Sequence, residues 1–164
     1  MMKKPLVQKK VDVATFGAGC FWHVEEAFRT LKGVITTEVG FMGGKLRSPS
    51  YHRVCHGDTG HVEVVHITFN PKLISYKELL HVFWKIHNPT TYHRQGLDIG
   101  EQYKSVIFYH ADEQKKLAEQ SKKELNRSGI YSKPIVTEIV RAATFYSAEE
   151  YHQKYLMKRG LKTC

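Results

Sequence analysis

Residues 11–33 read VDVATFGAGCFWHVEEAFRTLKG, and this stretch decides how the chain begins to fold. Its apolar start predicts a strand over 11–16, and the glycines of 17–19 predict a tight turn. From Cys20 to about Lys32 apolar residues recur at helical spacing, and Gly33 marks the end of the helix. The sequence therefore places a cysteine where a strand turns into a helix.

Strands and helices alternate through the rest of the chain. Strands are predicted over 34–41, 61–69, 103–109 and 135–142, and helices over 75–88, 112–127 and 147–159, with long loops at 42–60 and 89–102. The order β-α-β-β-α-β, followed by α-β-α, predicts an α+β fold. We expect a two-layer sandwich with a ferredoxin-like core, extra helices and long active-site loops. The expected organisation is one domain over 1–164, with its core at about 11–158 and a mobile tail at 159–164.

Composition indicates an ordinary globular enzyme or binding domain. The chain has 164 residues, of which 41% are hydrophobic and 25% charged. It lacks an apolar run of about 20 residues, so no membrane span is expected. The net charge of +9 permits nucleic-acid binding, but many lysines lie among glutamates on the predicted helix 112–127, which favours a solvated face. The basic N-terminus lacks a following apolar segment, so we expect a cytoplasmic protein.

Three cysteines, Cys20, Cys55 and Cys164, make a structural disulfide framework the wrong expectation. At a helix N-terminus the free amides and the helix dipole favour a thiolate, which is the nucleophilic form. Phe21 and Trp22 follow directly and would form an apolar cup beside the Cys20 sulfur. The alternative is that Cys20 is a small buried hydrophobic residue.

Glu63 falls on an apolar face of the predicted strand 61–69. Strand alternation places it on the side of Val65, Ile67 and Phe69. A carboxyl group buried there would have a raised pKa and could donate a proton. The alternative, equally open from the pattern, is a solvated start of the strand with Glu63 paired to a lysine.

The loops contribute further polar side chains, among them Tyr51, Asp98 and Tyr103. Most tyrosines only pack, and with nine in the chain composition does not single out two. The ten histidines do not form a recognisable metal motif, and phosphate-binding glycine motifs are absent from the sequence. We therefore expect neither a metal nor an organic cofactor.

Three blocks occur in order: Gly19-Cys20-Phe21-Trp22, then residues 57–63 (GDTGHVE), then residues 94–103 (RQGLDIGEQY). Together they make the chain resemble the A-type methionine sulfoxide reductases, the peptide-methionine (S)-S-oxide reductase family, from about Ala14 to Leu156. The resemblance implies a monomeric oxidoreductase for protein repair under oxidative stress, with thioredoxin or a similar dithiol protein as reductant.

The resemblance also implies a role for each matched residue. Cys20 would be the nucleophile, Glu63 the proton donor, Tyr51 and Tyr103 the hydroxyl donors, and Asp98 a carboxylate that orders the polar side. Phe21 and Trp22 would bind the substrate methyl group. Attack on the sulfoxide would leave Cys20 as a sulfenic acid, which a second thiol converts to an intramolecular disulfide. We expect Cys164, in a tail, to be that thiol, with Cys55 as the second choice.

Two positions depart from the family pattern. His23 stands where glycine is usual, and His93 stands where asparagine is common. Two other functions remain open at this stage. The chain could be a thiol peroxidase, or it could be a non-catalytic protein that binds oxidised methionine or nucleic acid.

Overall fold

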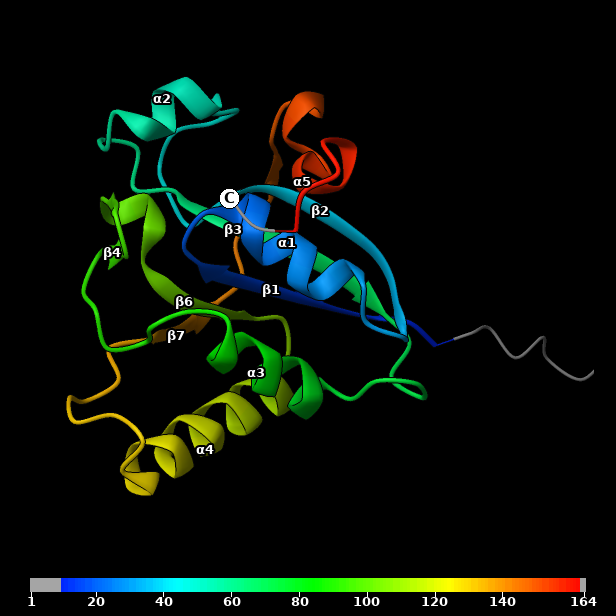
Figure 1. Cartoon of the computed structure of the whole chain (residues 1–164), viewed down its shortest axis with the longest axis vertical. Coiled ribbons are helices and arrows are strands. Elements are labelled where there is room, and N and C mark those ends of the chain that lie inside the picture. The colour runs from blue at the N-terminus through cyan, green and yellow to red at the C-terminus, as the bar shows by residue number, and fades with distance from the viewer. Residues whose placement is uncertain (1–9, 163–164) are drawn as a thin grey trace, which may run out of the picture.

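A computed structural model describes residues 10–162. A six-stranded sheet forms its centre, with the helices α1, α3 and α4 packed on one side (Figure 1). The elements are β1 (Asp12–Ala18), α1 (Phe21–Arg29), β2 (Val34–Met42), α2 (Tyr51–Cys55), β3 (Val62–Phe69), α3 (Tyr76–Lys85), β4 (Arg94–Gln95), β5 (Asp98–Ile99), η1 (Glu101–Tyr103), β6 (Ser105–Tyr109), α4 (Asp112–Ser128), β7 (Glu138–Arg141), β8 (Tyr146–Ser147), η2 (Glu150–His152) and α5 (Tyr155–Lys158). The predicted α+β class is confirmed.

The strand order is β7-β6-β1-β3-β2-β8. All neighbours are antiparallel except β6 and β7. Strand β3 lies between β1 and β2, and β1 lies between β3 and β6, so two split β-α-β units interleave. Because β1 and β3 run in opposite directions, the last residues of β1 and the first residues of β3 lie side by side at the same end of the strands.

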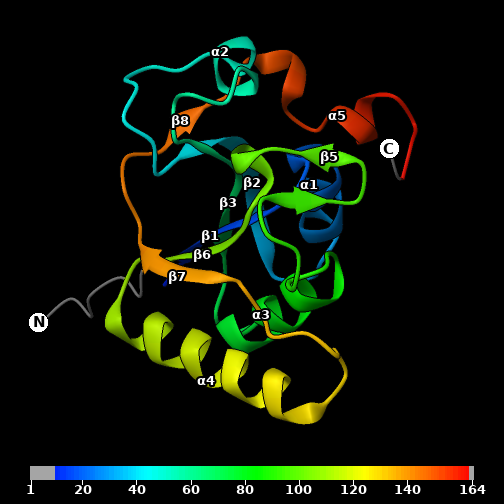
Figure 2. The same ribbon diagram turned by 90° about the vertical axis from the view of Figure 1, so that its left-hand side faces the viewer.

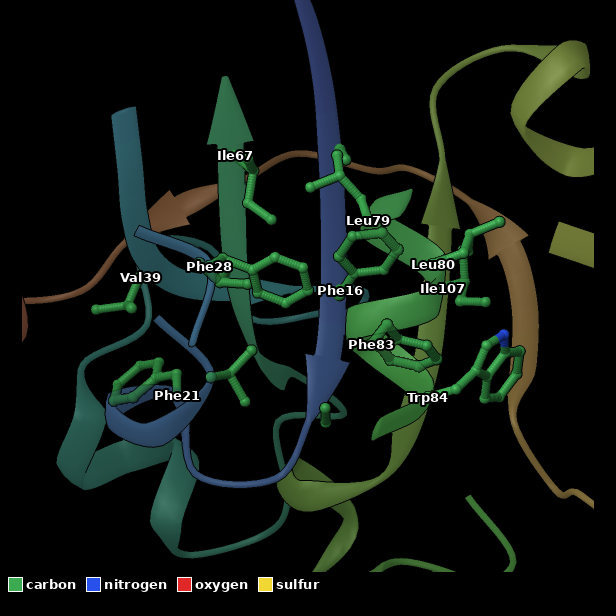
Figure 3. Close-up of a cluster of buried hydrophobic side chains, with 14 of the residues drawn as sticks. Phe16, Phe21, Phe28, Val39, Ile67, Leu79, Leu80, Phe83, Trp84 and Ile107 are labelled. Carbon is green, nitrogen blue, oxygen red and sulfur yellow. The ribbon is translucent and has the colours of Figure 1, made fainter. Parts of the chain in front are cut away.

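The helix-covered face holds the main apolar core. Phe16 on β1 stacks against Phe28 of α1 and Phe83 of α3, with ring centroids 5.4 and 5.1 Å apart (Figure 3). All three rings are fully buried. Helix α3 begins as the sequence predicts, with a capping box between Ser75 and Glu78 that satisfies the first amides.

The opposite face is covered by irregular chain. Val62, Val64 and Val106 pack there with Phe145, which belongs to the segment that crosses the sheet from β7 to β8. Within residues 10–162, no helix has the length and apolar character needed to cross a bilayer.

Three local predictions are wrong. The loop 42–60 contains α2, and the loop 89–102 contains the β4–β5 hairpin and η1. The single helix expected over 147–159 is instead η2 and α5, separated by Lys154 at φ +51°. The helix is broken because the Lys154 amide donates to the buried Glu25 carboxylate, and the Gln153 side chain pairs with the backbone of Val39 in β2.

Candidate active site

Cys20 is the N-cap residue of α1, directly after the turn that leaves β1. Gly19 in this turn has φ +97°, a conformation that side chains disfavour. Cys20 is half-buried and borders a cavity of about 290 Å³, lined by Ala18, Cys20, His23, Ile86, His87, Gln95 and Asp98. Cys20 is thus only partly buried and lies near polar groups, which argues against a purely structural role for this cysteine.

Glu63 is buried in β3 next to this turn. Only 1% of its surface is exposed, so the solvated alternative is wrong. Its Oε1 accepts a hydrogen bond of 3.1 Å from the amide of Phe21, the residue after Cys20. Burial raises the pKa of Glu63 to about 8, the like charge of Asp98 adds to the rise, and the Phe21 amide opposes it. The carboxyl group is therefore largely protonated at neutral pH.

The second Glu63 oxygen, Oε2, is buried and has no hydrogen-bond partner among residues 10–162. An unsatisfied buried oxygen costs free energy and is uncommon in folded proteins. Oε2 is therefore positioned to exchange a proton or a hydrogen bond with a bound molecule.

Tyr51 and Tyr103 reach the same region from different elements. Tyr51 opens α2, where Ser50 caps the helix, and Tyr103 ends η1. Burial raises the pKa of both phenols, and the Glu63 charge raises them further. Both hydroxyls consequently keep their protons and can donate hydrogen bonds. Both phenols therefore lie within electrostatic range of Glu63, as the family resemblance implies, although composition did not single out these two among nine tyrosines.

Phe21 and Trp22 extend from the first turn of α1 into an aromatic cluster. The Phe21 ring is fully buried against Phe41, Tyr51 and His152. The Trp22 indole stacks on Tyr155 with centroids 3.8 Å apart, and its Nε1 donates to His152 Nδ1 at 2.9 Å. The two rings therefore belong to one packed aromatic wall at the start of α1, and their contact with the substrate methyl group stays a prediction.

Sequence reasoning missed His152 and Tyr155, which hold this wall from the C-terminal segment. Burial lowers the pKa of His152, so its ring is neutral and can accept from Trp22. No pattern in the sequence marks His152, because the segment 147–159 was predicted to be a regular helix.

The remaining predicted residues occupy distinct places. Asp98 lies on β5 at the Cys20 cavity, although its side chain is exposed. Cys55 ends α2, and its thiol and the Tyr51 hydroxyl hydrogen-bond to each other. Cys164 lies outside the described residues.

The two departures from the family pattern also have places in the structure. His23 lines the Cys20 cavity. His93 has φ +47° and stacks on Tyr92. Asparagine and histidine both tolerate this left-handed backbone better than most residues, so the substitution is compatible with the loop.

Comparison with known proteins identifies the family and the fold. Residues 12–164 match the family model described as peptide methionine sulfoxide reductase. The chain belongs to this reductase family. It is 58% identical to the peptide methionine sulfoxide reductase MsrA of Methanosarcina mazei over 150 residues, which cover 92% of this chain and 71% of the relative.

Solved structures of this reductase family share the architecture. The reduced form of Mxr1 from Saccharomyces cerevisiae superimposes with a TM-score of 0.86 at 38% identity, covering 92% of this chain and 87% of Mxr1. Mxr1 has also been solved in complex with Trx2; that structure matches with a TM-score of 0.63 at 25% identity, covering 94% of this chain and 89% of the other.

Proposed function

We propose that the chain reduces the S-epimer of methionine sulfoxide, free or within proteins, by thiol chemistry at Cys20. One observation carries the proposal: the protonated, buried Glu63 accepts a hydrogen bond from the Phe21 amide beside Cys20, and its other oxygen has no hydrogen-bond partner in the described part of the chain. A sulfoxide is a neutral dipole with an acceptor oxygen and an apolar methyl group. It complements Oε2 on one side and the aromatic wall on the other.

The reductive step uses these groups together. The Cys20 sulfur attacks the sulfoxide sulfur while Glu63 protonates the sulfoxide oxygen and Tyr51 and Tyr103 donate hydrogen bonds to it. A bond forms between the two sulfurs, and the sulfur–oxygen bond breaks as the oxygen leaves as water, with one proton from Glu63 and one from the Cys20 thiol. A water molecule then attacks the Cys20 sulfur, so that the sulfur–sulfur bond breaks, methionine leaves, a proton returns to Glu63 and Cys20 becomes a sulfenic acid. Two electrons pass from the thiol to the sulfoxide, so the step needs no cofactor. Asp98 contributes by keeping the Glu63 proton in place through like-charge repulsion.

A second thiol then condenses with the sulfenic acid, releasing water and forming a disulfide. Cys164 is our first choice for this role. Burial and the nearby charges of Glu63 and Glu149 raise the pKa of Cys55, which makes it the weaker nucleophile. The structure of Mxr1 with Trx2 supports a thioredoxin as the external reductant.

The proposed setting is protein repair in the cytoplasm by a monomer, without nucleic acid or membrane partners.

The proposal is tested by chiral chromatography of methionine sulfoxide epimers after incubation with the protein and dithiothreitol. We expect loss of the S form alone, and no loss with Cys20→Ser. A Cys55→Ser variant is the matched control and should keep turnover. Consumption of peroxide without methionine formation would instead identify a thiol peroxidase. Binding of the sulfoxide without any dithiol consumption would identify a non-catalytic binder.

Turnover with thioredoxin tests the second thiol. Cys164→Ser should reduce one equivalent of substrate and then stall, whereas Cys55→Ser should continue. If Cys164→Ser sustains thioredoxin-dependent turnover, Cys55 takes the role or no second thiol is needed.

A further inference from the structure

Gln95 lies against the turn that presents Cys20. It sits on β4 opposite Asp98 of β5, and both residues line the Cys20 cavity. In the view of Figure 2 this hairpin is seen in front of α1. None of the catalytic roles described above involves Gln95, yet its side chain lies against Gly19 in the cysteine turn.

The amide of Gln95 is committed to the backbone of a single residue. The Asn88 amide donates to its Oε1 at 2.9 Å, and its Nε2 donates to the Asn88 carbonyl at 2.7 Å. Nε2 also lies 3.3 Å from Thr91 Oγ1. Since the backbone partners have fixed donor and acceptor character, the amide orientation is determined. The polar end of Gln95 is therefore held firmly and is not available to a substrate.

The aliphatic part of Gln95 presses on Gly19. A Cβ atom at Gly19 would lie 2.9 Å from Gln95 Cγ and 3.0 Å from its Cβ, so only glycine fits there. On the other side of Cys20, the Phe21 amide is bonded to Glu63. Both neighbours of Cys20 are thus held in place, Gly19 by the packing of Gln95 and Phe21 by the hydrogen bond to Glu63.

We propose that Gln95 is a positioning residue that fixes Cys20 relative to Glu63 and Asp98. It links the cysteine turn to the hairpin that carries Asp98, so that the nucleophile and the acid keep their geometry. This inference rests on the proposed function. Because a displacement of about 1 Å can cost about a hundred-fold in rate, loss of this anchor should slow chemistry without weakening substrate binding.

The test is single-turnover formation of methionine by Gln95→Ala, compared with the wild type and with Ser75→Ala. Ser75→Ala removes a helix cap remote in the fold from Cys20 and serves as the control for a simple loss of stability. For Gln95→Ala we expect a maximal rate that is ten- to a hundred-fold lower, with the half-saturating substrate concentration changed less than two-fold. The loss should be equal with dimethyl sulfoxide and with a sulfoxide-containing peptide, because Gln95 acts on Cys20.

Gln95→Met separates the two contacts, since it keeps the aliphatic part and loses the amide. An intermediate rate is expected. A rate for Gln95→Ala equal to that of Ser75→Ala at temperatures where both are folded would overturn the proposal. So would a defect confined to the peptide or to half-saturation, which would make Gln95 a substrate contact. If the wild type itself forms no methionine, the proposed function fails rather than this inference.

Discussion

At the scale of the residue, Glu63 combines two properties that usually exclude each other. It is buried among apolar neighbours, and it is a titratable group with one oxygen lacking a partner among the described residues. The protein accepts the cost of this burial because the raised pKa keeps a proton available at neutral pH.

The pH dependence of the reductive step should report Glu63. With a pKa of about 8, the single-turnover rate should fall as the pH rises through 8, since the acid loses its proton. Glu63→Gln should lower the rate by about 10² to 10⁴-fold and remove this fall. A wild-type rate that stays level between pH 7 and pH 9 would contradict the role.

Glu63 should also affect stability, in the opposite direction to most carboxylates. Unfolded, the group releases its proton near pH 4.5, whereas the folded protein retains it to about pH 8. The unfolded state thus binds fewer protons between these values, and the free energy of unfolding falls as the pH rises across this interval. Glu63→Gln, which can still accept from the Phe21 amide, should therefore be more stable than the wild type at pH 8, as measured by urea denaturation.

At the scale of the element, the capping box of α3 offers a change that separates stability from activity. Ser75→Ala leaves the Glu78 amide without its side-chain acceptor and should lower the free energy of unfolding by about 1 kcal/mol. Ser75→Asp restores an acceptor and should recover most of it. Neither variant should change the maximal rate, because only the other end of this helical segment reaches the Cys20 cavity.

Elements with their own repeating pattern were predictable, and elements held by distant contacts were not. The strand-turn-helix at Cys20 and the capping box of α3 follow from local spacing and were confirmed. Gln153 illustrates the opposite case, since its amide pairs with both backbone groups of Val39, 114 residues away. Local propensity carries no information about such a contact, and for the same reason His152 was missed.

The Gln153 contact should stabilise the C-terminal segment against the sheet. Gln153→Leu leaves the buried Val39 amide without its acceptor and removes a donor from the Val39 and Ala148 carbonyls, so it should lower the free energy of unfolding by about 2 kcal/mol. Because the segment carries His152, the half-saturating sulfoxide concentration should rise as well. Thermal denaturation and steady-state kinetics check both effects, and a shift in stability alone would separate the segment from substrate binding.

At the scale of the whole molecule, the chain has 25 basic and 16 acidic residues and therefore a net charge of +9. This positive charge should attract an acidic reductant and speed its association. Raising the ionic strength from about 0.01 M to about 0.15 M shortens the Debye length from about 30 Å to about 8 Å. The KM for an acidic thioredoxin should rise several-fold, whereas turnover with neutral dithiothreitol should not change. Equal salt responses would show that charge plays no part in this encounter.

The buried oxygen Glu63 Oε2, which has no hydrogen-bond partner among the described residues, also distinguishes the substrate of the proposed reaction from its product. A sulfoxide brings an oxygen that completes the bonding of this carboxyl group, whereas the thioether produced from it brings none. Once the sulfoxide oxygen has been removed, the product no longer forms this hydrogen bond with the carboxyl group, and it binds less tightly. The unsatisfied Oε2, whose burial lowers the stability of the protein without substrate, therefore also favours release of the product.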